Sequence, residues 1–429
     1  MTTNMIITLA IVILMVAIII SDKLPFGAPA LLACAALVVT NQADVATAFS
    51  GFTDKNVVMI MGFMAAMAAL QKTTFIHKME EFLGNVAKKG GIGGFVLLLI
   101  AIMAVSNFIG GTAYYILVIT LISTIPYNKE LPTSRILLPA AMASGAGGWL
   151  PNGVAMFAGL IASLCSGQGY EVEPVSMTRM IIINVCWSVV LLVYAVLAHR
   201  WLPDRDISEG VAENKDELGQ KKEFVKTLSD TQEKIVYAGY IFLVCSLIFQ
   251  SKFPGEIAYG IPLCIAGLFM ACGIVNFKEV LNNMFSPVLI MMASVIGVAA
   301  AMSNCGLSAV IGQAIGNLLG GSPSLFVLVL VFAVLTSVMA TFTGASFGSL
   351  FIFAPIGITL CIQYGYNPVP LTLACVKAAW INYFMPIDGM PALVMGIGKY
   401  KLTEFWRFVV PQWIIQMLLV CGLATVLFG

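Results

Sequence analysis

Polar residues and glycines interrupt this apolar sequence at four places, and these are the places where chemistry is expected. They are residues 106–112 (SNFIGGT), 144–153 (SGAGGWLPNG), 341–346 (TFTGAS) and 380–391 (WINYFMPIDGMP). Non-helical backbone at membrane depth survives only inside protein or beside a watery cavity. Such breaks expose helix N-termini, which favour anions, and carbonyl ends, which favour small cations. The candidate substrate- or ion-binding residues are Ser106, Asn107, Thr112, Asn152, Gly153, Thr343, Ser346, Asn382 and Asp388.

Two ionisable residues stand out in the last of these regions. Lys377 and Asp388 are eleven residues apart, or about three helical turns. Ionisable groups at membrane depth are costly and are usually functional, so both are candidates for coupling transport to an ion. The structural alternatives are that Asp388 caps a helix and that Lys377 reaches along its helix toward the interface.

No nucleotide-binding loop, nucleophile triad or metal-spaced cluster occurs in the sequence. Ten cysteines are scattered without a CxxC pair, as is typical of small buried hydrophobes. We therefore expect neither an enzyme nor a metal site, and no cofactor apart from Na⁺ or H⁺ as a coupling ion.

The composition is that of a membrane protein, with 60% hydrophobic and 10% charged residues. Several apolar runs reach the ~20 residues that a bilayer-spanning helix needs. The sequence predicts an all-α polytopic membrane protein. Crossings are expected near residues 5–21, 26–41, 55–71, 178–198, 234–250, 257–276, 286–303 and 405–428, with broken crossings at 134–165 and 367–398.

The sequence contains an internal repeat. Val57 corresponds to Val288, an offset of 231 residues, and Leu150 to Met385, an offset of 235. Paired interruptions in two halves are a sequence pointer to a transporter's binding site. The predicted domains are a first repeat, 1–199, with a hairpin at 91–126 and a broken helix at 134–165; a cytoplasmic linker, 200–233; and a second repeat, 234–429, with a hairpin at 322–363 and a broken helix at 367–398.

Charge predicts that the two repeats are inverted. Each copy has five predicted crossings, because its hairpin enters and leaves on one side, and an odd number reverses the second copy. The segment 72–91 carries four lysines, whereas its counterpart, 304–321, has no Lys or Arg. The positive-inside rule then places the first segment in the cytoplasm and both chain termini outside. We expect the protein to lie in the cell (inner) membrane.

These segments resemble the divalent anion:sodium symporter family of the ion transporter superfamily, whose members carry a citrate-transporter-like domain. The resemblance lies in the string 48–52 (AFSGF) leading into 57–61, in the stretches 92–165 and 324–398, and in the Pro-rich break at 385–396. It implies a dimerising scaffold, a transport domain that holds the breaks, and elevator-type alternating access. It also implies cation-coupled uptake of dicarboxylates or related anions.

The chain departs from this family at the ligand-bearing tips. The family's Ser-Asn-Thr signature is replaced by Gly110-Gly111-Thr112 in the first hairpin. In the second hairpin its place is taken by about Ala345-Ser346-Phe347. Because these losses remove oxygen ligands for Na⁺, we hypothesise that Lys377, Asp388 or both replace a bound cation, either by fixed charge or by cycling a proton.

The sequence thus favours a secondary transporter, expected to be a homodimer, that moves a small organic anion such as a di- or tricarboxylate by symport with Na⁺ or H⁺. The alternative is a cation/proton antiporter on the same scaffold, with Asp388 as its carrier carboxylate. A channel or a purely structural membrane protein is a third class, which the paired breaks argue against. No nucleic-acid partner is expected.

Overall fold

A computed structural model describes most of the chain. Its backbone description covers residues 2–429 except 22, 26, 110, 111, 124, 126, 127, 130, 208, 209, 212–226, 319–322, 344, 345, 382 and 386–388. The side chains of residues 20, 112, 113, 152, 251, 312, 313, 315, 316, 318 and 389 are also outside the description. Within the described part all regular secondary structure is helical, as the composition predicts.

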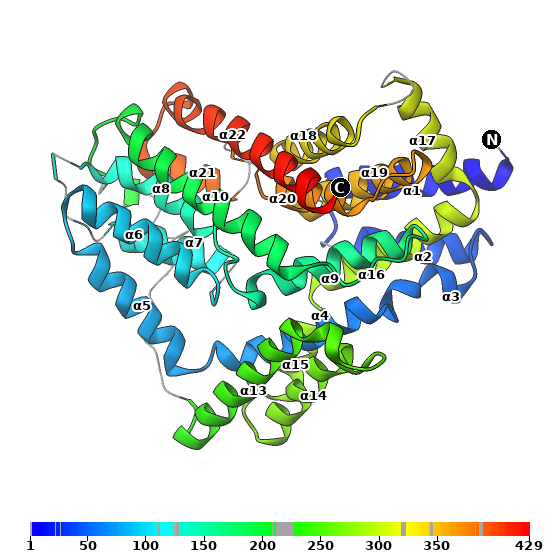
Figure 1. The fold of residues 1–429 in the computed structure, drawn as a ribbon, viewed down its shortest axis with the longest axis horizontal. Coiled ribbons are helices and arrows are strands. Elements are labelled where there is room, and N and C mark those ends of the chain that lie inside the picture. Colours follow the sequence, from blue (N-terminus) through cyan, green and yellow to red (C-terminus); the bar gives the residue numbers. More distant parts are fainter. Residues whose placement is uncertain are drawn as a thin grey trace.

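Each half of the chain contains the same succession of helices (Figure 1). The first half runs α1 (Thr3–Ser21), α2 (Ala28–Val39), α3 (Val45–Ala48), η1 (Ser50–Phe52), α4 (Lys55–Leu70), α5 (Thr74–Ala87), α6 (Gly91–Val105), α7 (Thr112–Ser123), α8 (Thr133–Ser144), α9 (Pro151–Gly167), α10 (Met177–Ala198) and η2 (His199–Trp201). The second runs α13 (Asp230–Ile248), η3 (Gln250–Lys252), α14 (Ile257–Ala271), α15 (Phe277–Met284), α16 (Pro287–Asn304), α17 (Leu307–Leu318), α18 (Leu325–Thr343), α19 (Ser346–Gln363), α20 (Val369–Ala379), α21 (Gly389–Gly398) and α22 (Leu402–Phe428).

The predicted interruptions fall between helices in both halves. The hairpin tips separate α6 from α7 and α18 from α19, and the breaks separate α8 from α9 and α20 from α21. Five described helices are long and apolar enough to cross a membrane, namely Met177–Trp201, Pro287–Asn304, Leu325–Thr343, Ser346–Gln363 and Leu402–Phe428. A sixth crossing arises if α4 and α5, which meet at a bend of 70°, form one span. The other predicted crossings form shorter or less apolar helices.

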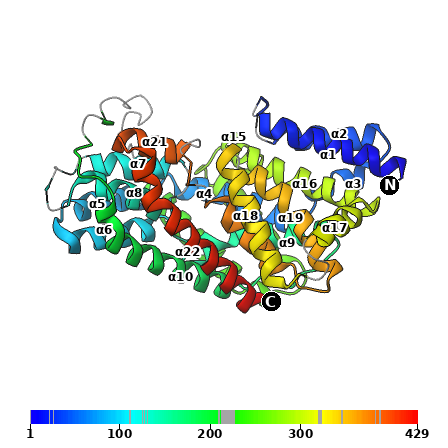
Figure 2. The same ribbon diagram turned by 90° about the horizontal axis from the view of Figure 1, so that it is seen from above.

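One half-helix from each half of the chain, α9 or α21, packs against helices of the other half (Figure 2). Helices α7 and α8 pack with α21, which belongs to the second half, and α19 and α20 pack with α9, which belongs to the first. The result is two lobes, each with its own buried apolar cluster. Helices α10 and α22 lie against each other and run diagonally from one lobe to the other. A third cluster joins α4 to α13, α14 and α15.

Glycines permit close contacts between helices at two places. A Cβ at Gly62 of α4 would lie 2.4 Å from the backbone nitrogen of Leu263 in α14. A Cβ at Gly297 of α16 would lie 1.9 Å from the carbonyl oxygen of Ala48. Since the opposing atoms are backbone, neither side can move aside locally. Small residues at such crossings are the usual means by which helices approach closely in membranes.

The predicted linker is described in part. Arg205 forms an ion pair with Glu404 at the start of α22, with an Nη2–Oε1 distance of 2.8 Å. Its backbone N–H donates to the hydroxyl of Ser134 in α8 at 3.1 Å. The start of the linker is therefore fixed to α8 and α22. Residues 208, 209 and 212–226 lie outside the described part of the chain.

We expect Gly297→Ala to destabilise the protein by about 1–3 kcal/mol, because the added Cβ overpacks a backbone contact. Gly267→Ala in α14 is the matched control, since nothing lies within 4 Å of its added Cβ and alanine is the better helix former. The measurement is the thermal unfolding midpoint of each variant in detergent. Equal midpoints for the two variants would contradict the close contact.

Candidate functional site

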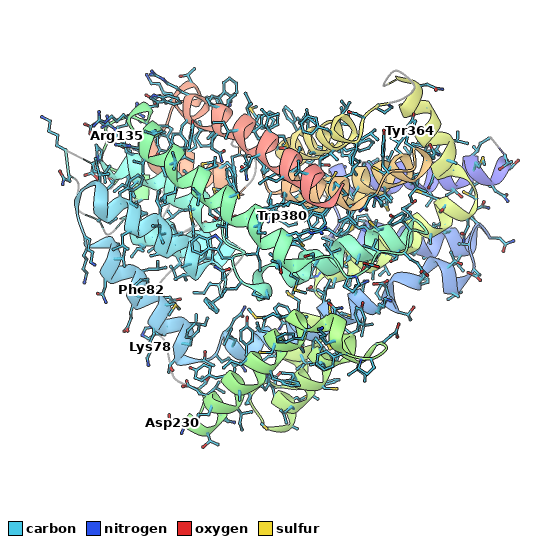
Figure 3. All side chains as sticks on the ribbon, viewed as in Figure 1. Lys78, Phe82, Arg135, Asp230, Tyr364 and Trp380 are labelled. Carbon is cyan, nitrogen blue, oxygen red and sulfur yellow. The ribbon has the colours of Figure 1, made fainter. Side chains whose placement is uncertain are left out.

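A cavity of about 380 Å³ lies where the interrupted segments meet. Its wall takes residues from the first hairpin tip, both breaks, the start of α19, and the long helices α10 and α22. Trp380, at the end of α20, lies in the middle of the molecule (Figure 3). Four segments that are far apart in the sequence thus converge on one space, and its volume is within the range of small-molecule sites.

Asn107 holds the first hairpin tip to the first break. Its Oδ1 accepts hydrogen bonds from the backbone N–H groups of Gly148, Trp149 and Leu150 at 3.1, 2.8 and 3.1 Å. Its Nδ2 donates to the carbonyls of Met103 and Ala104 at 3.1 and 3.0 Å. The side chain is buried, and its one amide oxygen satisfies three backbone N–H groups that would otherwise be costly to leave unpaired.

This arrangement uses most of the anion-binding capacity at the start of α9. Pro151, the first residue of α9, has no N–H. The N–H of Gly153 donates to the carbonyl of Leu150 at 3.0 Å. These positions were predicted to bind an anion, whereas the N–H groups of Gly148, Trp149, Leu150 and Gly153 donate within the protein. Gly153 itself lines the cavity, and a Cβ there would lie 2.8 Å from the Cα of Gly148.

Two serines cap the carbonyl ends of the broken helices in the same way. Ser188 of α10 donates to the carbonyl of Ala146 and accepts from the indole of Trp149 at 2.7 Å. Ser337 of α18 donates to the carbonyl of Ile381 and accepts from the indole of Trp413 at 2.8 Å. The two carbonyls are 235 residues apart, the offset of the repeat at the breaks. These carbonyl ends were predicted to favour a cation, and each accepts a serine hydroxyl.

Lys377 is the only charged side chain among the described residues that line the cavity. It lies in the last turn of α20, and its ammonium sits 5.6 Å from the ring centroid of Phe157 in α9. No described carboxylate forms an ion pair with it. Trp380 packs edge-on against Phe157 at 5.4 Å and against Phe347 at 4.7 Å. The cavity therefore combines one fixed positive charge with an aromatic wall.

Several polar cavity residues lie outside the predicted set of site residues, among them two tyrosines and two amides. Tyr115 and Tyr383 line the cavity from different halves, and both hydroxyls lie within 3.2 Å of where a Cβ on Gly145 would be. Asn184 of α10 donates to the carbonyl of Gly148 at 2.9 Å. Gln416 of α22 accepts from Gln412 at 3.1 Å. The two amides are polar residues in the interiors of apolar helices, which is the signal that could have identified them.

The structure brings some of the predicted site residues to the cavity and leaves others away from it. Ser106, Gly153, Ser346 and Lys377 line it. Thr343 donates its hydroxyl to the carbonyl of Met339 in its own helix at 2.7 Å and is absent from the described lining. The remaining predicted residues lie outside the described part, namely Asn382 and Asp388 entirely, and Thr112 and Asn152 in their side chains.

Two hairpins and two broken helices that converge on a central cavity define a membrane transporter. The chain matches the model of the citrate transporter family over residues 15–259 and 256–429. It belongs to the citrate transporter family, as the resemblance at the hairpins and breaks indicated.

Curated relatives and a solved structure agree with this assignment. The chain is 23% identical to the transporter YfbS of Escherichia coli (strain K12) over 189 residues, which cover 44% of this chain and 30% of that protein. It is 24% identical to the sodium-dependent dicarboxylate transporter SdcS of Staphylococcus saprophyticus over 257 residues, 54% of this chain and 48% of that protein. The matches thus span less than half the length of either relative. The crystal structure of the Alcanivorax borkumensis YdaH transporter shares the fold, with a TM-score of 0.61, 17% identity, and coverage of 89% of this chain and 87% of that one.

We expect Asn107→Ala to lower the unfolding midpoint in the absence of any substrate. The variant leaves several buried backbone groups unpaired, each at a cost of about 1–3 kcal/mol. Ser123→Ala, in the other helix of the same hairpin, is the control, because the one bond of its hydroxyl within the described part of the chain is to the carbonyl of Thr120. An unchanged midpoint, with loss of substrate binding alone, would contradict the bracing role and restore Asn107 as a ligand.

Proposed function

We propose that this protein is a secondary active transporter for a small organic anion, with a carboxylate as the group it recognises. One observation carries the proposal: the described lining of the central cavity has a single charged side chain, the cation Lys377, and no carboxylate. An ammonium that pairs with no described carboxylate attracts an anion and repels a free cation in such a site. Membership of the citrate transporter family and the name of the relative SdcS support the same substrate chemistry.

Lys377 would form the ion pair with the substrate, and nearby hydroxyl and amide groups would orient it. Ser106 and Ser346 line the cavity at the two hairpin tips, and Gln416 lines it from α22. Thr112, Asn152, Thr343, Asn382 and Asp388 remain candidate ligands, by the positions of the interrupted segments. Charge-assisted hydrogen bonds to a carboxylate are stronger than neutral ones, so the ammonium would contribute most of the polar attraction.

The coupling ion is Na⁺ or H⁺, and Lys377 bears on the choice. A fixed ammonium can supply the charge that a bound Na⁺ would otherwise supply, and the carbonyls of Ala146 and Ile381 already accept serine hydroxyls. We propose that Lys377, alone or with Asp388, replaces at least one bound cation. The cation/proton antiporter is the alternative, and it would depend on Asp388 as its carrier carboxylate.

The arrangement of the helices in two lobes bears on the mode of transport. We propose elevator-type alternating access in a homodimer in the cell membrane, with inverted repeats and both termini outside. The repeated order of helices, the exchanged half-helices and the 70° bend between α4 and α5 support this proposal. The division into repeats at 1–199 and 234–429, joined by a cytoplasmic linker at 200–233, belongs to the same proposal.

Uptake into proteoliposomes tests the transport activity. Labelled C4–C6 carboxylates are offered under an imposed Na⁺ gradient, an imposed H⁺ gradient, or neither. We expect saturable uptake that follows one of the gradients. Vesicles that show no uptake, but change their internal pH when Na⁺ is added without organic solute, would favour the antiporter.

We expect Lys377→Met to reduce carboxylate affinity by about 100-fold, since removing one partner of a buried charge pair costs about 2–5 kcal/mol. Lys377→Arg keeps the charge and should retain part of the binding. Lys55→Met is the matched control, because Lys55 also lies over an aromatic ring, at 5.4 Å from Tyr259, but is absent from the described lining of the central cavity. Unchanged affinity in Lys377→Met would contradict the counter-ion role, and unchanged Na⁺ dependence in both Lys377→Met and Asp388→Asn would contradict cation replacement.

A further inference from the structure

The charge inventory of the cavity limits how many anionic groups it can neutralise. Lys377 supplies one positive charge, and no second cation occurs among the described lining residues. A carboxylate without a partner is costly to remove from water, by several kcal/mol even after relaxation. A second carboxylate on the substrate would therefore need another strong donor group in the wall.

The most obvious such group, the N-terminus of α9, is already occupied. The three backbone N–H groups before α9 donate to Oδ1 of Asn107, and that of Gly153 donates to Leu150. Their hydrogen bonds are satisfied inside the protein, so binding a second carboxylate there would require breaking them. The positive charge in the described part of the cavity is thus enough to neutralise a single anionic group.

The part of the wall beside Lys377 is suited to an apolar body. Beside the ammonium lie the rings of Phe157 and Trp380, packed edge-on at 5.4 Å, with Phe347 behind Trp380 at 4.7 Å. Aliphatic side chains from α10, α20 and α22 continue this surface, namely Ile183, Val376 and Val420. Burying apolar surface is favourable at roughly 25 cal/mol per Å², and aromatic pairs add about 0.5–1.5 kcal/mol through their ring geometry.

The position of Lys377 joins the two features. Its ammonium lies 5.6 Å from the centroid of Phe157, so the charge is held against the aromatic wall itself. A carboxylate paired with Lys377 would direct the rest of its molecule along Phe157 and Trp380. From this geometry we propose that the substrate is a monocarboxylate with an aromatic or branched apolar body, in preference to a di- or tricarboxylate. This inference rests on the proposed function and specifies its substrate class.

Binding of two matched acids to the full-length purified protein tests the inference. Calorimetry in detergent compares 3-phenylpropionate with succinate, which replaces the ring by a second carboxylate. We expect 3-phenylpropionate to bind at least about tenfold more tightly, equivalent to about 1.4 kcal/mol. Tighter binding of succinate would overturn the monocarboxylate assignment and leave carboxylate transport standing, whereas no binding of either acid or of any C4–C6 carboxylate would overturn the proposed function as well.

Two variants distinguish the contribution of the aromatic wall to affinity from that of the Lys377 charge. Phe157→Leu should lower the affinity for 3-phenylpropionate by about tenfold, from lost aromatic contact, and leave that for butyrate within about twofold. Phe326→Leu, an exposed phenylalanine at the other end of α18 from the hairpin tip, should change neither affinity, and thermal midpoints verify that both variants fold. Equal losses for 3-phenylpropionate and butyrate in Phe157→Leu would contradict the aromatic wall as a determinant of specificity.

Discussion

Irregular backbone in a membrane-embedded protein must find its hydrogen bonds within the protein, and the central part of this structure depends on that constraint. At the first break, Asn107 satisfies three N–H groups with one oxygen. At the carbonyl ends of both broken helices, Ser188 and Ser337 supply hydroxyls to Ala146 and Ile381. These three side chains come from a hairpin tip, a long crossing helix and a hairpin helix, so satisfying the breaks also fixes the elements around the cavity.

This bracing changes where the affinity for substrate must come from. Helix N-termini and carbonyl ends are usual ion sites in transporters with broken helices. Here the described ones at the first break are engaged by protein groups, and a lysine side chain provides the charge beside an aromatic wall. Affinity for an anion would then reside mainly in one replaceable residue. Specificity would reside in the apolar surface next to it, while the backbone at the break serves chiefly to hold the shape.

The helical membrane fold and the positions of its interruptions were predictable from the sequence. The helices are interrupted between α6 and α7, α8 and α9, α18 and α19, and α20 and α21, where glycine, proline and polar residues cluster within an apolar run and weaken the helix. The exchange of α9 and α21 between lobes was not predictable, since the repeat specifies the order of helices and not their packing partners.

The site was only partly predictable for a related reason. Lys377 was identified because a charge in an apolar segment is conspicuous. Asn107 was expected to be a ligand, but whether its amide turns to the cavity or to the backbone depends on three residues that are about forty positions away. Asn184 and Gln416 lie in the long helices α10 and α22, outside the interrupted segments on which the prediction was based.

The cavity beside Lys377 is, on this interpretation, the place where the transported anion binds. The most direct measurement is an experimental structure with a brominated analogue of the best-transported carboxylate, in which anomalous scattering locates the bromine. We predict a bromine peak against Phe157 and Trp380, with the carboxylate at the ammonium of Lys377. A saturating ligand that leaves this cavity empty, or that binds only in the apolar groove between Phe108 and Tyr240, would contradict it.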